Sequence, residues 1–176
     1  MRVKPWKLFA GILVAAAAYY LANPLGIPSL DPRARMLGFV LYSVPSQSMQ
    51  PTLESGDLVL CNIWPYVLGE PKRGDILVFR VPDKTAASYV KRVIGLPGDL
   101  LAMYDHQVYI NEVAIAEPYI RRPFFPGRGS YGSLAPTRIP AGHYFMLGDS
   151  RDNSRDSRIF GLVPKANLIG RIDTIF

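Results

Sequence analysis

Cysteine and histidine, on which disulfides, many metal sites and catalytic triads depend, are scarce in this sequence. Of its 176 residues, one is a cysteine and two are histidines. A single thiol excludes an internal disulfide framework and any metal site built from several thiolates. The two imidazoles, at His106 and His143, leave little room for a histidine metal site or a histidine-based triad. Charged residues make up 19% and apolar residues 49%, which excludes an intrinsically disordered chain.

Helix breakers, by contrast, are abundant. Sixteen prolines and fifteen glycines argue against a helical bundle and favour many short strands joined by turns. The net charge of +6 is unevenly distributed, because Arg2, Lys4 and Lys7 supply three of the six charges. The remaining chain has an ordinary balance of charge, so the basic composition does not indicate nucleic-acid binding.

An uncharged segment, Leu8–Ala22, follows these basic N-terminal residues. It is slightly short for a membrane span, but Trp6 and Tyr20 suit the two interfaces. A cleavable signal peptide is the alternative; the residues before Asn23 lack the small–any–small pattern that cleavage there requires. We therefore expect a single-pass anchor in the plasma (inner) membrane, with a cytoplasmic N-terminus and the rest of the chain exported. The predicted units are an anchor at 1–22, a proline-rich linker at 23–35 and a globular domain at 36–176.

Short runs rich in Val, Ile, Leu, Phe and Tyr recur through this domain. They predict strands within 36–44, 57–63, 75–81, 88–95, 107–115, 143–148 and 168–176. Three Gly-Asp pairs begin tight turns into strands, and Asn111-Glu112 is placed at a hairpin tip. The expected fold is all-β: a mostly antiparallel sheet or partly open barrel, preceded by one transmembrane helix.

The stretch 118–140 differs in composition and is predicted to be a long surface excursion. Three interpretations stay open for Phe124 and Phe125, beside several arginines: contact with an anionic bilayer, stacking on bases, or packing onto the core. Nucleic-acid binding is not assigned on this basis.

Serine chemistry without histidine requires another base, and a neutral lysine is the natural substitute. Lys91 lies in the apolar run 89–95, where it shares a strand face with Tyr89 and Val93. Burial would lower the pKa of its amine, although the pattern alone favours an outward lysine. Cys61, within an apolar run, is expected to be a buried small side chain rather than a nucleophile.

Four segments combine in a specific order: PSQSMQPTL at 45–53, GDILVFRVP at 74–82, YVKRVIGLPGD at 89–99 and GDSRDNSRDSRIFG at 148–161. Together they resemble the successive signature segments of type I signal peptidases, which are serine proteases with a Ser/Lys dyad.

This resemblance implies roles for particular residues. Ser48 corresponds to the nucleophile and Lys91 to the general base. The backbone N–H of Ser48 and the hydroxyl of Ser46 correspond to the oxyanion hole, and Ser154 to the serine that positions the lysine. Gln47 departs from the glycine that the family often has there, which bears on the geometry of the turn.

Two further sets of residues follow from the resemblance. Charged residues in the last segment brace its loop: Asp149, Arg151, Asp156 and Arg158. Residues matching the shallow apolar pockets for the substrate are Tyr42, Val44, Pro45, Met49, Leu53 and Val90. The alternative for each of these residues is a place in the core, and for Leu53 the two interpretations are equal.

The implied activity is the removal of N-terminal signal peptides from exported preproteins through an acyl-enzyme, with no cofactor and no metal. The predicted partners are these preproteins and the lipid bilayer, without nucleic acid; the oligomeric state stays open. Two alternatives remain: a maturation peptidase specialised for a conjugation or pilin system, and a catalytically silent membrane-tethered binding module.

Overall fold

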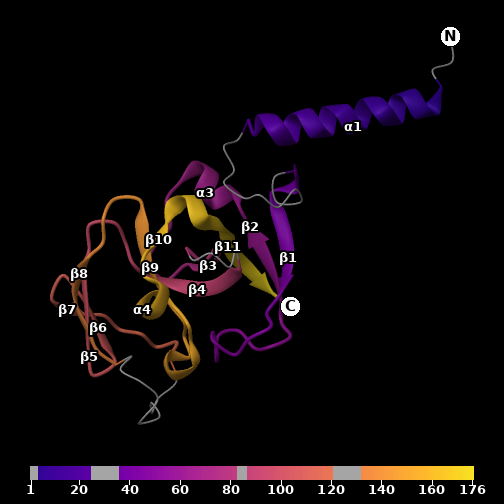
Figure 1. The fold of residues 1–176 in the computed structure, drawn as a ribbon. Coiled ribbons are helices and arrows are strands. Elements are labelled where there is room, and N and C mark those ends of the chain that lie inside the picture. Colours follow the sequence, from indigo (N-terminus) through magenta and orange to yellow (C-terminus); the bar gives the residue numbers. More distant parts are fainter. Residues whose placement is uncertain (1–3, 25–35, 83–86, 121–131) are drawn as a thin grey trace.

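The structure, a computed structural model, describes residues 4–24, 36–82, 87–120 and 132–176. An N-terminal helix precedes two antiparallel sheets (Figure 1). Both predicted features, the antiparallel β fold and the helix before it, are confirmed.

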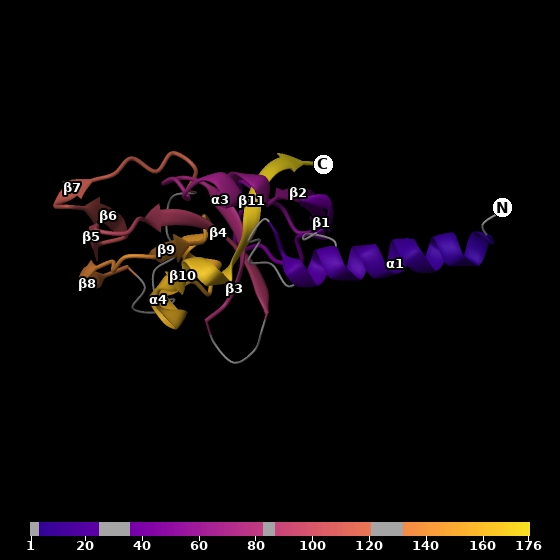
Figure 2. The same cartoon turned by 90° about the horizontal axis from the view of Figure 1, so that it is seen from above.

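Helix α1 spans Pro5–Ala22 and begins one turn earlier than the uncharged segment. Pro5 suits the first helical position, and the helix ends at Asn23, which adopts a left-handed conformation with φ 42°. At about 1.5 Å per residue the helix approaches the ~30 Å hydrocarbon core of a bilayer. None of its residues is buried, and it extends away from the sheets (Figure 2). It is long and apolar enough to cross a membrane.

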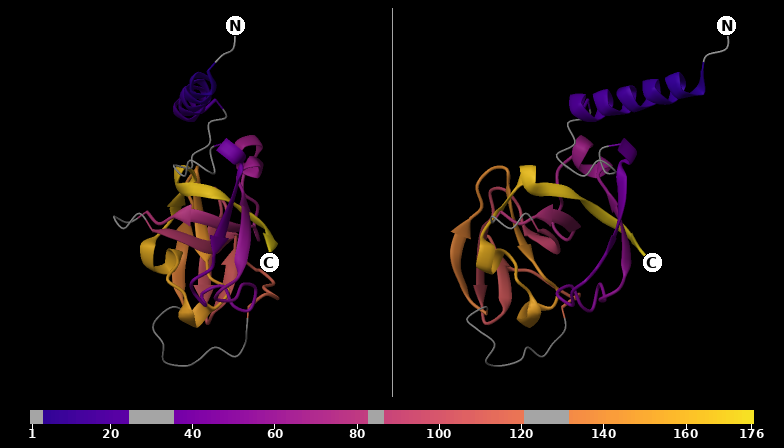
Figure 3. Two further views of the ribbon diagram at one scale, coloured as in Figure 1. Left: turned by 90° about the vertical axis from the view of Figure 1, so that its right-hand side faces the viewer. Right: turned by 45° about the vertical axis from the view of Figure 1, so that its right-hand side comes forward.

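The larger sheet has seven strands in the order β1-β2-β11-β3-β4-β9-β10, and every neighbouring pair is antiparallel. It curls into a partly open barrel (Figure 3). Its strands are β1 (Phe39–Ser43), β2 (Leu58–Asn62), β3 (Ile76–Arg80), β4 (Ser88–Gly95), β9 (His143–Leu147), β10 (Val163–Pro164) and β11 (Leu168–Ile175). Short helical segments connect them: α3 (Trp64–Leu68), η1 (Arg151–Asn153), α4 (Ser157–Phe160) and η2 (Lys165–Asn167).

The smaller sheet has four strands in the order β7-β6-β5-β8. They are β5 (Leu100–Tyr104), β6 (Gln107–Ile110), β7 (Val113–Ala114) and β8 (Leu134–Arg138). The predicted hairpin tip is confirmed, since Asn111 and Glu112 both have positive φ between β6 and β7.

The three Gly-Asp turns share one geometry. Gly56, Gly74 and Gly98 each have a positive φ. In each turn the following aspartate accepts a hydrogen bond from the backbone N–H three residues before it, at 2.6–2.9 Å. These turns fix where strands β2, β3 and β5 begin.

Strand β9 joins the two halves of the core. Tyr144 and Met146 pack into one apolar cluster with Phe79, whereas Phe145 and Leu147 pack into a second cluster with residues of the smaller sheet. Alternate side chains point to opposite faces of a strand, so both faces of β9 are buried. This explains its uninterrupted apolar sequence.

Three strands were not predicted: β5, β8 and the two-residue β10. Strand β5 follows a Gly-Asp turn directly, and β8 lies inside the stretch expected to be an excursion, so that stretch is shorter than 118–140. Pro136 interrupts the β8 sequence, and a proline is tolerated here because β8 is the edge strand of its sheet. Phe124, Phe125 and the neighbouring arginines lie outside the described residues.

Candidate active site

Ser48 lies in the turn that follows β1. The Gln50 N–H donates to the Gln47 carbonyl at 3.2 Å, and the Val44 N–H pairs with the Asp57 carbonyl across from β2. Met49, next to Ser48, is buried in an apolar cluster with Leu53 and Val59. The turn is therefore fastened to the core on one side, and Ser48 itself is 8% exposed.

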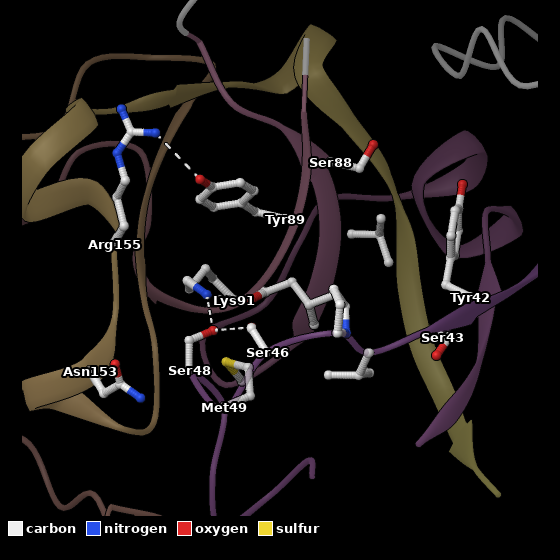
Figure 4. Close-up of a pocket in the computed structure, with 14 residues that line it drawn as sticks. Tyr42, Ser43, Ser46, Ser48, Met49, Ser88, Tyr89, Lys91, Asn153 and Arg155 are labelled. Carbon is white, nitrogen blue, oxygen red and sulfur yellow. Dashed lines mark hydrogen bonds between the residues drawn. The ribbon is translucent and has the colours of Figure 1, made fainter. Parts of the chain in front are cut away.

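Lys91 lies on β4, opposite Leu77 of β3, and is 3% exposed. Its Nζ lies 2.5 Å from Ser48 Oγ and donates to the Val90 carbonyl at 2.9 Å (Figure 4). The two residues are 43 positions apart in the sequence, and the sheet brings them into direct contact. The sequence pattern alone favoured an outward lysine, whereas this side chain is inward.

Burial lowers the pKa of the Lys91 amine from 10.5 to about 8. Desolvation is the main cause; Asp156 and Asp149 oppose it, and Arg158 adds to it. Both carboxylates form ion pairs with arginines, which limits their effect on the lysine. At pH 7 roughly one-tenth of the amine is uncharged and can accept a proton from the serine hydroxyl.

Two other serines lie beside this pair. Ser46 Oγ is 3.1 Å from Ser48 Oγ, on the exposed side of the turn. Ser154 Oγ is buried and has no hydrogen-bond partner among the described residues. A side chain at position 148 would clash with this hydroxyl and with the Ser48 carbonyl. The lysine-positioning role of Ser154 therefore remains a prediction.

The loop that carries Ser154 is held by buried ion pairs. Asp149 binds Arg92 through two hydrogen bonds, of 2.9 and 2.6 Å, and also accepts from the Thr52 hydroxyl. Asp156 binds Arg158 through two hydrogen bonds of 2.8 Å and accepts from the Gly148 N–H. Asp149, Asp156 and Arg158 lie close enough to influence the pKa of Lys91, and their role in bracing the loop stays a prediction.

Arg151 pairs with a residue that sequence reasoning missed. Its guanidinium binds both carboxylate oxygens of Glu117, and this pair is almost fully buried. Tyr119 donates to Glu117 at 2.8 Å, and the Arg92 guanidinium lies 3.9 Å from the centroid of the Tyr119 ring. The segment after β7 therefore contacts both Arg151 and Arg92, the arginine that pairs with Asp149. The only sequence signal was an acidic residue just before 118–140 and an aromatic residue at its start.

Backbone contacts connect this loop to Ser48. The Ser150 N–H donates to the Ser48 carbonyl at 3.1 Å. A Cβ on Gly148 would come within 2.5 Å of the same carbonyl and 2.2 Å of Ser154 Oγ. Only glycine allows this close approach. The loop therefore fixes the backbone position of Ser48.

A cavity of about 400 Å³ opens beside the pair (Figure 4). Five of the six residues predicted for substrate pockets line it: Tyr42, Val44, Pro45, Met49 and Val90. Leu53 does not; it is fully buried in the adjacent cluster, which is the core alternative. Lining residues that sequence reasoning did not assign are Ser43, Val78, Ser88, Tyr89, Asn153 and Arg155.

The remaining candidates lie elsewhere. Cys61 is fully buried, and burial raises the pKa of its thiol to about 12. His143 lies at the start of β9, with its Nδ1 3.0 Å from the Ala141 carbonyl, and His106 lies in the turn between β5 and β6. Within the described ranges no group of three or more His, Cys, Asp or Glu residues is arranged to hold a metal ion.

A serine in contact with a buried lysine beside an open groove is the arrangement of a nucleophile and its base, as serine hydrolases use. The sequence model of the family described as signal peptidase, peptidase S26, matches residues 8–176. The chain belongs to this family.

Individual relatives of this chain are named signal peptidase I. The chain is 42% identical to signal peptidase I of Bacillus caldolyticus over 147 residues, covering 79% of this chain and 80% of the relative. It is 35% identical to signal peptidase I of Pseudomonas aeruginosa, covering 74% of this chain and 62% of that longer protein. The crystal structure of a signal peptidase I from Enterococcus faecalis matches with a TM-score of 0.53 and 33% identity, covering 59% of this chain and 97% of that one.

Proposed function

We propose that this chain is a membrane-anchored serine endopeptidase that removes signal peptides from exported preproteins. The observation that carries the proposal is the 2.5 Å contact between Lys91 Nζ and Ser48 Oγ in a buried site beside a groove. Family membership and the relatives named signal peptidase I support it. A lone surface serine and lysine would not carry it, because the lysine would remain protonated.

The reaction follows from these atoms. Ser48 Oγ attacks the scissile carbonyl while Lys91 Nζ takes its proton, and the Ser48 N–H and the Ser46 hydroxyl bind the resulting oxyanion. The C–N bond then breaks, and the Lys91 ammonium returns the proton to the leaving amine. Lys91 then takes a proton from a water whose oxygen attacks the acyl carbon; the bond to Ser48 Oγ breaks, and the Lys91 ammonium returns the proton to Ser48 Oγ.

Helix α1 places this chemistry at a membrane. We propose that α1 spans the bilayer with its basic N-terminal end in the cytoplasm, which puts the sheets on the exported face. Preproteins emerge there from the membrane, so an anchored enzyme meets its substrates at a raised local concentration.

The test is a cleavage assay with the full chain in detergent and a panel of unrelated preproteins, with Ser48→Ala as the matched control. Cleavage of many precursors by the unmodified chain alone supports the proposal, and cleavage of a single one indicates a specialised maturation peptidase. Absence of cleavage, together with no labelling of Ser48 by a serine-reactive acylating probe, would indicate a silent binding module.

The rate is expected to rise with pH. Only the uncharged Lys91 amine accepts a proton, and its pKa of about 8 means that roughly one-tenth is uncharged at pH 7. On a logarithmic scale, kcat/KM should increase with a slope near one up to about pH 8 and then level off. Peptide cleavage between pH 6 and 9.5 measures this. A profile that is flat between pH 6 and 8 would contradict the lysine as base.

Ser154→Ala is expected to lower kcat roughly tenfold or more with little change in KM, because we assign the hydroxyl to orienting the lysine during turnover. Its stability should be unchanged or slightly raised, since the hydroxyl is buried without a partner among the described residues. Steady-state kinetics and thermal unfolding check both parts. An effect confined to KM, or a marked loss of stability, would contradict the positioning role.

A further inference from the structure

In the proposed reaction Lys91 becomes a cation inside a buried site. It is neutral when it takes the serine proton, and it is an ammonium ion until it returns that proton. Its amine contacts Ser48 Oγ at 2.5 Å and the Val90 carbonyl at 2.9 Å. Neither contact is with a carboxylate, so among the described residues the ammonium ion has no ion-pair partner of its own.

The charged groups around the amine do not supply such a partner. Asp149 and Asp156 act on it at longer range, but each forms an ion pair with an arginine, Arg92 and Arg158 respectively. Arg158 itself disfavours the charged form of the lysine. Another group must therefore favour the cation as it forms.

The aromatic ring of Tyr89 lies against the amine. Lys91 Nζ is placed over this ring, 5.6 Å from its centroid, which is within the range of a cation–π contact. The two residues are two positions apart on β4, so their side chains project from the same face of the strand. The ring packs edge-on against Phe160, and its hydroxyl accepts a hydrogen bond from Arg155 at 3.3 Å (Figure 4). Two neighbours thus fix the orientation of the ring.

We propose that the ring face of Tyr89 stabilises the Lys91 ammonium ion as it forms, and so lowers the barrier to attack by Ser48. The inference rests on the proposed peptidase function and adds a positioning residue to its mechanism. A ring face attracts a cation much more strongly than a neutral amine. The contact therefore strengthens as the proton moves to the lysine, which is the condition for accelerating a reaction.

This role predicts a particular pH dependence. Above the pKa of Lys91 the resting amine is neutral, so only the transition state gains from the ring. Well below that pKa the resting lysine is already an ammonium ion and gains as much, so the two effects cancel. Loss of the ring should lower the plateau of kcat/KM roughly fivefold and move the midpoint of the profile down by about 0.7 in pH. The rate on the acid side should stay the same, whereas loss of a merely structural side chain would lower the rate at every pH.

The test uses the full chain in detergent and begins from Tyr89→Phe as the reference. One, two and then three fluorine atoms are added to the phenylalanine ring, because fluorine withdraws electron density from the ring face with little change in shape. Tyr89→Leu removes the ring altogether. The matched control carries the same series at Tyr104, an exposed tyrosine of β5 outside the groove. Peptide cleavage between pH 6 and 9.5 and NMR titration of the Lys91 amine are measured on each chain.

We expect the pKa of Lys91 and the plateau of kcat/KM to fall together with each added fluorine, and furthest in Tyr89→Leu. The Tyr104 series should show no trend. Equal values along the Tyr89 series, a loss of rate at every pH without a change in pKa, or a raised pKa in Tyr89→Leu would each overturn the role of the ring, while cleavage by the unmodified chain would still support the peptidase. Failure of the unmodified chain to cleave any peptide would instead overturn the proposed function, and with it the part played by Tyr89.

Discussion

Lys91→Met is expected to abolish cleavage and at the same time to stabilise the protein. Methionine keeps the length and apolar stem of the side chain but has no amine to accept the Ser48 proton. Loss of the general base should reduce kcat/KM by about 10⁴-fold. Ser48→Ala removes the nucleophile and should be at least as severe.

The gain in stability follows from the pKa of the lysine. Its folded value of about 8 lies below its ordinary value of 10.5, so the folded state binds fewer protons than the unfolded state. The lysine therefore destabilises the fold below pH 8, and this penalty disappears as the pH rises from 8 to above 10.5. At pH 7 the difference is worth about 3 kcal/mol, which Lys91→Met should recover in part.

Urea unfolding of the full chain at pH 7 and pH 10 measures this effect. The unmodified chain should gain free energy of unfolding relative to Lys91→Met as the pH rises. Cleavage by purified Lys91→Met at a normal rate would contradict the mechanism. A variant that is less stable than the unmodified chain at pH 7 would contradict the cost assigned to the buried amine.

Asp149→Ala is expected to cause the largest loss of stability. The Asp149 side chain is fully buried and its Arg92 partner is 11% exposed, so the substitution leaves a buried guanidinium without its carboxylate. Breaking such a pair typically costs 3–5 kcal/mol. Because the neighbouring Ser150 N–H binds the Ser48 carbonyl, activity should fall as well, even at temperatures where the variant is folded.

Thermal unfolding and peptide cleavage, both on the full chain, check this result. Asp173→Ala is the matched control, since the pair of Arg171 and Asp173 is much more exposed and should contribute at most about 1 kcal/mol. Equal effects of the two substitutions would show that burial of the Asp149 pair does not matter.

Local sequence signals predicted most of the strands. Apolar runs and Gly-Asp pairs mark strands because turn geometry and core packing act on the same few residues. Strand β8 escaped prediction because its sequence is interrupted by Pro136 and is tolerable only at an edge. That constraint comes from the sheet and is absent from the segment itself.

The candidate site was predicted only in part. The motif order led to Ser48 and Lys91, but the burial of Lys91 depends on partners across the sheet. Glu117 and Tyr119 could not be found from the sequence, because their effect on the loop arises only when the segment after β7 lies against Arg92 and Arg151.

Direct titration of the Lys91 amine tests the central claim most sharply. NMR of the full chain in detergent, with lysine labelled with ¹³C at Cε, reports the pH at which each amine loses its proton. The signal that is missing from Lys91→Met should titrate near pH 8, well below the ordinary lysine pKa of about 10.4. If that signal instead titrates at the ordinary pKa of a lysine, the amine is charged at neutral pH and does not serve as the base for Ser48.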